Sequence, residues 1–120
     1  AIVTNAKKER VLKVLKYHNI NQYFSFIISC KNKVKPKPSP DGYKKACEKL
    51  NLKPSDVAVI EDSDAGIKSA RAAGVKKIFR YTYKNKNFSN SFIYNEIKLG
   101  DYKNLLSFNK SVARENHGLA

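Results

Sequence analysis

Three short stretches of the sequence combine hydroxyl, ammonium and carboxylate groups in an order suited to phosphate chemistry. Thr4 and Asn5 follow the apolar run at 1–3. A hydroxyl or backbone amide at this point could hold phosphate oxygens near a helix N-terminus. The alternative is that Thr4 or Asn5 only caps the helix that follows, because such caps are common. Taken alone, this stretch favours the cap.

The second stretch is centred on Lys37, which has Pro36 and Pro38 on either side. These prolines restrict the backbone around the lysine and remove local amide donors. A lysine fixed in this way could aim its ammonium group inward and neutralise a phosphoryl group or a nearby carboxylate. The alternative is a stiff, solvated basic loop, which the loop on its own would favour.

The third stretch is the acid pair Glu61 and Asp62, which ends the apolar run at 57–60. Two acids at the tip of a buried strand are costly unless a cation compensates them. Mg²⁺ prefers one or two protein carboxylates together with waters and substrate phosphate, so the pair indicates a magnesium site. The alternative is that both acids only begin the next helix, where negative charge is favourable. Asp64 is expected to supply only such charge.

These stretches need a scaffold, and the sequence alternates short apolar runs with helical periodicity. Strands are expected at 1–3, 24–29, 57–60, 75–79 and, at a sheet edge, 91–97. Helices are expected at 7–18, from Pro40 with Ser39 as its N-cap, at 65–73 before Gly74, and at 101–108. The alternation predicts an α/β fold with parallel strands, whose carboxyl ends form a ligand-binding edge.

Helical spacing also predicts which side chains face the core. On the first helix they are Val11, Leu12, Val14, Leu15 and His18, and on the second they are Tyr43, Ala46, Cys47 and Leu50.

The composition limits the classes of partner. A formal net charge of +14 could hold nucleic acid, but the lysines are spread over nearly every segment and no nucleic-acid-binding motif occurs. A basic nucleic-acid-binding module is therefore the less favoured alternative. No apolar run could cross a bilayer, and residues 1–10 lack the order of a signal peptide, so no membrane partner is expected. Cys30 and Cys47 form neither a metal motif nor a disulfide framework, which favours a reduced, cytoplasmic setting.

In this order the three stretches resemble the motifs of the haloacid dehalogenase-like (HAD) superfamily, in its β-phosphoglucomutase and phosphoglycolate phosphatase branch. IVTN is similar to motif II, KPSPD to motif III, and VIEDSDAGIKSARAAG to motif IV. The resemblance covers residues 1 to about 79 and implies a three-layer α/β core domain with a Rossmann-like parallel sheet, which we expect to extend over residues 1–112. The sequence pattern beyond Val112 predicts a flexible tail at 113–120.

The resemblance also implies a Mg²⁺-dependent phosphatase or phosphomutase that acts on a small phosphorylated metabolite, such as a sugar phosphate or phosphoglycolate. Thr4 would bind the transferring phosphoryl group, and Lys37 would stabilise its charge. Asp62 would be a direct Mg²⁺ ligand. Glu61 would orient Lys37 or a metal-bound water without touching the metal. Asn5 is a weaker candidate for a contact with the phosphate or substrate.

The first motif of that family, DxDxT or similar, does not occur in this sequence. It carries the nucleophilic aspartate of an aspartyl-phosphate mechanism, on a strand between those of motifs II and IV. We therefore expect an incomplete sheet that lacks its central strand, and a chain that is inactive alone. An N-terminal segment, in the same or another chain, would supply the nucleophile and any cap domain. The alternative is an inactive remnant that binds a partner or phosphate.

Overall fold

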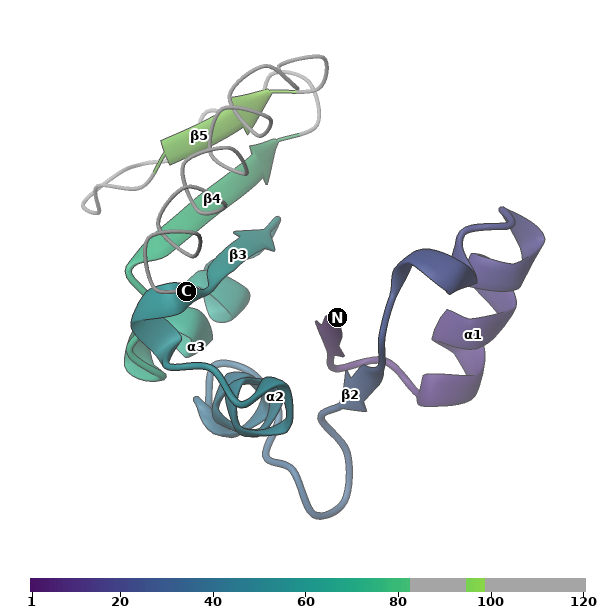
Figure 1. The fold of residues 1–120 in the computed structure, drawn as a ribbon, viewed down its shortest axis with the longest axis horizontal. Helices are drawn as coiled ribbons and strands as arrows, with labels where there is room; N and C mark the ends of the chain where they lie inside the picture. Colours follow the sequence, from purple (N-terminus) through teal and green to yellow (C-terminus); the bar gives the residue numbers. More distant parts are fainter. Residues whose placement is uncertain (83–94, 99–120) are drawn as a thin grey trace, which may run out of the picture.

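Strands and helices alternate along the computed structural model, which describes residues 1–82 and 95–98 (Figure 1). The strands are β1 (Ile2–Thr4), β2 (Ile27–Ser29), β3 (Ala58–Glu61), β4 (Lys77–Thr82) and β5 (Asn95–Lys98). The helices are α1 (Lys8–Tyr17), α2 (Asp41–Leu50) and α3 (Asp64–Ala72), with 3-10 turns at Asn21–Tyr23 and Pro54–Asp56. This arrangement confirms the predicted α/β class. The helix expected at 101–108 and the boundary at residue 112 lie outside the described residues.

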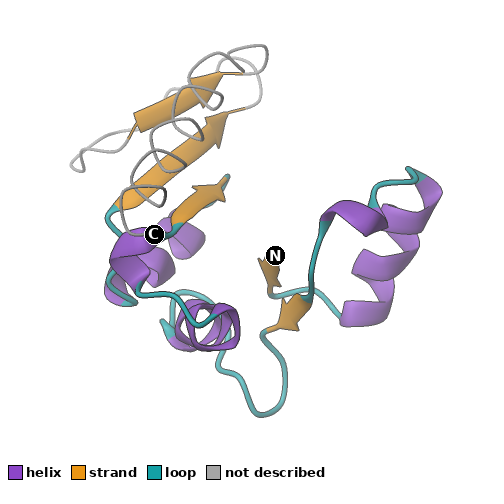
Figure 2. Cartoon of the chain, viewed as in Figure 1, coloured by secondary structure: helices purple, strands orange, loops and turns teal. Residues whose placement is uncertain are grey.

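The described strands form two parallel sheets rather than one (Figure 2). In the first, β1 pairs with β2, and Thr4 is opposite Ser29. In the second, β3 pairs with β4 and β4 with β5, and Glu61 is opposite Arg80. Within the described part of the chain β3 is therefore an edge strand. This pairing agrees with the expectation of an incomplete sheet.

Some element ends differ from the predicted ones, and local hydrogen bonds explain two of the shifts. The helix predicted from Pro40 begins at Asp41, because the Pro40 carbonyl accepts the first helical bond, from Lys44 N at 3.0 Å. Pro40 is therefore the N-cap, and the prediction of Ser39 there was wrong. The strand predicted from Val75 begins at Lys77, because the Val75 amide still closes the end of α3 by donating to the Ala70 carbonyl.

That helix end follows a common C-terminal motif. The Gly74 amide donates to Arg71 O, and Val75 donates to Ala70 O, which is the Schellman pattern of bonds. Gly74 has a φ of +93°, a conformation that side chains with a Cβ rarely adopt. The predicted position of this glycine just after the helix is thus confirmed.

Two hydrophobic clusters lie on either side of α2. Tyr43 belongs to the cluster between α3 and the β3-β4 pair, whereas Ala46 belongs to the cluster beside β2. Val3 of β1 packs against both clusters. Since α2 and β1 touch both clusters, they connect the two sheets and hold the carboxyl ends of β1 and β3 in a fixed relation.

The predicted inner faces of α1 and α2 are narrower than expected. Leu15 is buried, but Val14 is 52% exposed and Leu50 is 39% exposed, so both predictions were wrong. A sheet of two strands covers only a narrow stripe of α1, and Leu50 lies in the last position of α2. His18, beyond the end of α1, is also exposed.

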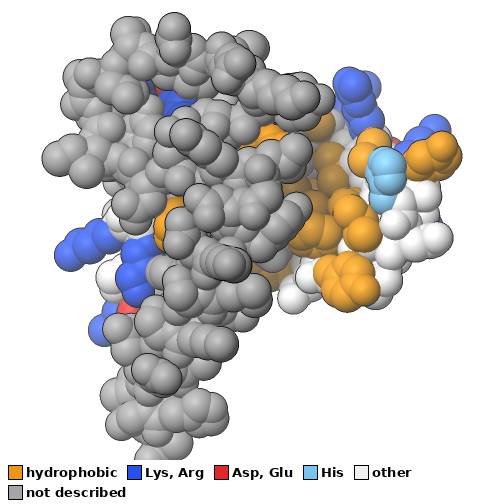
Figure 3. All heavy atoms as spheres, turned by 90° about the horizontal axis from the view of Figure 1, so that it is seen from above, with side chains coloured by type: hydrophobic (Ala, Val, Ile, Leu, Met, Phe, Trp, Pro, Cys, Tyr) orange, Lys and Arg blue, Asp and Glu red, His pale blue; other side chains and the backbone are white. Residues whose placement is uncertain are grey.

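Hydrophobic side chains gather at the α1 end of the molecule in the view of Figure 3. Among the exposed large hydrophobic residues of the described part of the chain, Tyr17 and Tyr23 are the most exposed. Across residues 1–82 and 95–98, no helix has the length and apolar character needed to cross a membrane.

Candidate functional site

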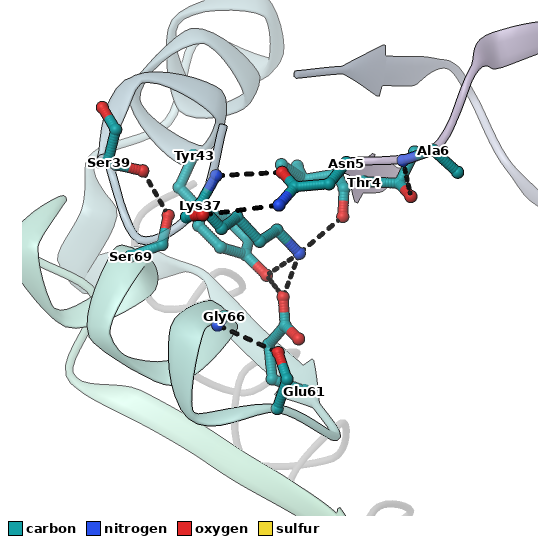
Figure 4. A network of polar contacts seen from close by, with 11 residues as sticks. Thr4, Asn5, Ala6, Lys37, Ser39, Tyr43, Glu61, Gly66 and Ser69 are labelled. Carbon is teal, nitrogen blue, oxygen red and sulfur yellow. Dashed lines mark hydrogen bonds and ion pairs between the residues drawn. The ribbon is translucent and has the colours of Figure 1, made fainter. Parts of the chain in front are cut away.

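The backbone of Lys37 is held by the side chain of Asn5. The Lys37 amide donates to Asn5 Oδ1 at 2.9 Å, and Asn5 Nδ2 donates back to the Lys37 carbonyl at 3.4 Å (Figure 4). Prolines at 36 and 38 have no N–H, so the Lys37 amide is the donor that this part of the loop can offer. The Asn5 side chain therefore fixes the backbone of Lys37, and the sequence did not predict this contact.

The Lys37 ammonium group reaches across from its loop to the end of β3. Nζ donates to the Val3 carbonyl at 2.8 Å and forms an ion pair with Glu61 Oε1. The Lys37 side chain is only 9% exposed and that of Glu61 only 7%. The two residues are thus a buried ion pair between the two sheets. Such a pair is favourable when further hydrogen bonds surround it.

Tyr43 supplies one of those further hydrogen bonds. Its hydroxyl donates to Glu61 Oε1, and its oxygen lies 3.4 Å from Lys37 Nζ. Burial first, and then the hydrogen bond to Glu61 and the negative charge of that residue, raise the pKa of Tyr43 well above its usual value. The hydroxyl is therefore a protonated donor. Sequence reasoning placed Tyr43 only in the core, because helical spacing says nothing about the reach of its hydroxyl.

Gly66 makes room for the Glu61 carboxylate. A Cβ at residue 66 would lie 2.0 Å from Glu61 Oε2. Glu61 is the last residue of β3, and Gly66 lies in the first turn of α3, so the carboxylate occupies the space that a side chain would take. The glycine of the EDSDAG stretch is thus needed for packing against the buried acid.

Thr4 is the last residue of β1, whereas the sequence had placed it just after a strand at 1–3, and its hydroxyl closes the turn that follows. Thr4 Oγ1 accepts from the Ala6 amide at 3.0 Å, while Ser29 Oγ donates to the Ala6 carbonyl at 2.7 Å. The N-cap of α1 is Lys7, without a side-chain capping bond, so neither Thr4 nor Asn5 caps this helix. Ser29, at the end of the neighbouring strand, was missed, although its place after an apolar run is the same signal that drew attention to Thr4.

Asp62 follows β3 directly and is exposed, in contrast to Glu61. No hydrogen bond or ion pair with another described residue engages its carboxylate. Ser63 is the N-cap of α3 and accepts from the Gly66 amide at 3.0 Å, so the acid pair lies before the helix. Asp64 begins the helix, as expected, and forms an ion pair with the buried Arg80.

The donor set at this edge is compatible with Mg²⁺. An accessible carboxylate such as Asp62 is the hard oxygen ligand that this cation takes, and Mg²⁺ keeps several waters and uses few protein ligands. Within residues 1–82 and 95–98, no cluster of three or more His, Cys, Asp or Glu side chains is present. Asp62, which directly follows Glu61 of the buried ion pair, is therefore the candidate ligand from this part of the chain.

A fixed ammonium, a hydroxyl at a strand end and an exposed carboxylate occur together in proteins that handle phosphate, and the comparison with known families agrees. A model of haloacid dehalogenase-like hydrolases matches residues 1–80. The chain belongs to this family. The match covers all the residues of the HAD-like site described above, from Thr4 to Asp62.

Individual relatives support the same assignment. The chain is 30% identical over 79 residues to a phosphorylated carbohydrates phosphatase of Thermotoga maritima, covering 66% of this chain and 37% of that protein. It is 34% identical over 74 residues to a phosphoglycolate phosphatase of Nitrosospira multiformis, covering 62% and 33%. The chain thus spans little more than a third of the length of these HAD-like relatives.

The fold is also similar to solved HAD-like structures. A conserved haloacid dehalogenase-like protein of Agrobacterium tumefaciens matches with a TM-score of 0.72 at 25% identity. The match covers 94% of this chain and 54% of that protein. The predicted Rossmann-like HAD fold is confirmed by this likeness.

Proposed function

We propose that the protein containing this chain is a Mg²⁺-dependent phosphatase or phosphomutase that acts on a small phosphorylated metabolite. The observation that supports this most directly is the buried contact of Lys37 with Glu61, beside a strand end that bears Thr4. The relatives named above are phosphatases of phosphorylated carbohydrates and of phosphoglycolate. A sugar phosphate or phosphoglycolate is therefore the substrate class that we propose.

In this proposal each side chain has one task. Thr4 binds an oxygen of the transferring phosphoryl group, and the Lys37 ammonium offsets the charge that develops on it. Glu61 holds the Lys37 ammonium group in position through their ion pair. Because the Asn5 side chain is used on the Lys37 backbone, we propose that Asn5 acts mainly by holding that loop in place.

Asp62 would hold Mg²⁺, which supplies positive charge to the phosphoryl oxygens when bound. Glu61 is less suited to that task, because its Oε1 already accepts from Lys37 and Tyr43.

The phosphoryl group would pass first to an aspartate and then to water or to another hydroxyl of the substrate. We propose that this aspartate lies outside the chain, on a strand that pairs with β1 and β3. The separation of the two sheets and the 51% exposure of Ile60 in β3 support such a strand. We also propose a reduced, cytoplasmic setting, which the two free and buried cysteines, Cys30 and Cys47, support.

The proposal is tested by measuring phosphate release from a panel of sugar phosphates and phosphoglycolate. The complete protein should turn over at least one of them with Mg²⁺, should lose activity after chelation and should regain it when Mg²⁺ is returned. Asp62→Ala should lower kcat on the order of a hundredfold or more. The matched control Asp56→Ala, also an exposed acid, should not. Full turnover by Asp62→Ala would contradict the metal assignment.

A further inference from the structure

The hydroxyl of Tyr43 shares the buried cluster of Lys37 and Glu61, and its part there goes beyond packing. An ammonium group has three protons to donate. On Lys37 they face three acceptors: the Val3 carbonyl at 2.8 Å, Glu61 Oε1, and the Tyr43 oxygen at 3.4 Å. The contact of Nζ with the Tyr43 oxygen is longer than its contact with the Val3 carbonyl, and the Tyr43 oxygen belongs to a neutral phenol. It is therefore the contact that an incoming group displaces most easily.

We propose that Tyr43 is a positioning residue for the phosphoryl transfer, holding Glu61 in place while its oxygen accepts the third proton of Lys37 until a phosphate oxygen replaces it. This inference rests on the function proposed above. It assigns to the tyrosine a role in the reaction that is exerted through Lys37 and Glu61, without contact with the substrate.

The exchange requires little movement of the lysine. The Val3 carbonyl and Glu61 keep two of the three ammonium bonds, so Nζ stays in place while one bond changes partner. A phosphate oxygen is charged, and a charge-assisted hydrogen bond is stronger than one to a phenol oxygen. Lys37 is thus preorganised for phosphate before phosphate arrives.

Tyr43 also restrains Glu61, the ion-pair partner of Lys37. Its hydroxyl donates to the same Glu61 oxygen that accepts from Lys37, which fixes the carboxylate from a second direction (Figure 4). Without the hydroxyl the carboxylate would lose this restraint and could move with the ammonium group. Lys37 would then be aimed less well, even though the ion pair remained.

Tyr43→Phe isolates the hydroxyl from the rest of the side chain. The aromatic ring belongs to the core cluster of Val59 and Ile67, and its centroid lies 5.0 Å from Lys37 Nζ. Phenylalanine keeps this packing and the contact between the ring and the cation. Tyr17→Phe is the matched control, because Tyr17 is 83% exposed.

The first measurement is the NMR signal of the Lys37 ammonium group in the complete protein labelled with ¹⁵N-lysine, identified by its loss in Lys37→Met. Tyr43→Phe should raise the exchange rate of this ammonium with water on the order of tenfold, because one hydrogen bond is lost. Tyr17→Phe should leave it unchanged. An exchange rate in Tyr43→Phe equal to that of the wild type would overturn the inference.

The second measurement is the kinetics of phosphate release. Tyr43→Phe should lower kcat about tenfold and change KM less than about threefold. The variant loses the positioning of the Lys37 ammonium group in the transition state, while binding of the substrate is retained. Faster ammonium exchange with unchanged kcat would show a purely structural hydroxyl and overturn the positioning role. If the Lys37 ammonium group of the wild type exchanges slowly but the protein releases no phosphate, the proposed function is refuted. Faster ammonium exchange in Tyr43→Phe would in that case still support the contact between Tyr43 and Lys37.

Discussion

At the scale of residues, the site is a small set of polar groups, some of them buried, that hold one another. Lys37 and Glu61 are paired, Tyr43 donates to the same carboxylate oxygen, and Asn5 fixes the lysine backbone. Because each group satisfies a neighbour, a change in one of them should be felt by the others.

Gly66→Ala tests how tightly the Glu61 carboxylate is held. The new Cβ would occupy the place of the carboxylate, which could move away only by leaving Lys37 and Tyr43. Glycine to alanine in a helix normally stabilises, but here we expect a loss of about 1–3 kcal/mol in the free energy of unfolding. Urea unfolding measures it, with Lys68→Ala in the same helix as control. A stabilised Gly66→Ala variant would show that Glu61 relocates freely.

The Tyr43 hydroxyl should also make stability depend on alkaline pH. Its pKa is raised in the folded state above the ordinary value of 10, so the stability it contributes is complete below about pH 10 and is lost as the pH rises further. The slope is at most about 1.4 kcal/mol per pH unit. Between pH 9 and 11 the wild type should therefore lose more stability than Tyr43→Phe, as measured by urea unfolding. Parallel curves would mean that the hydroxyl titrates normally.

At the scale of elements, α2 connects the two sheets, and its close approach to β1 and β2 sets the distance between Lys37 and Glu61. Gly42 in its first turn allows this approach, since a Cβ there would lie 2.6 Å from Cys30 Sγ and 2.8 Å from Val3 Cγ1. Both neighbours are themselves packed in the cluster beside β2. The helix can therefore accept a larger residue only by moving away from the sheet.

Gly42→Ala should lower the free energy of unfolding by about 1–3 kcal/mol through overpacking. It should also reduce kcat, because α2 begins only a few residues after Lys37. Lys44→Ala, an exposed position on the same helix, is the control and should change neither quantity appreciably. Thermal unfolding and phosphate release measure the two effects. A neutral Gly42→Ala would indicate that α2 does not fix the distance between the sheets.

Elements and site were predictable from the sequence to different degrees. The order of strands and helices followed from periodicity. The prolines beside Lys37 and the acid pair at the end of β3 drew attention to Lys37 and Glu61, which do meet in space. The tasks of Tyr43 and Ser29 were not predictable, because they depend on where a hydroxyl reaches across an interface. The exposure of Val14 was also missed, because the periodicity of a helix does not reveal the width of the sheet that packs against it.

At the scale of the whole molecule, α2, β1 and the ion pair of Lys37 with Glu61 connect the two parallel sheets of the described part of the chain. Ile60, in the strand that faces the first sheet, is 51% exposed. If the proposed strand from outside this chain pairs with β3, Ile60 is buried in the complete protein.

Ile60→Asp should then destabilise the complete protein by more than about 2 kcal/mol, because a charge would be buried without a partner. Leu52→Asp is the matched control: Leu52 is 45% exposed but lies outside the strands, so it should change stability by less than about 0.5 kcal/mol. Urea unfolding of the two variants measures the contrast. Equal, small effects would argue against a strand beside β3.

The role of Lys37 in stabilising a transferring phosphoryl group is tested by kcat for phosphate release by Lys37→Met. This kcat should fall about 10²–10³-fold, because one preorganised charge is removed from the transition state. Lys35→Met, an exposed lysine in the same loop, should keep the wild-type kcat. A folded Lys37→Met protein with the kcat of the wild type would show that Lys37 does not stabilise the phosphoryl group.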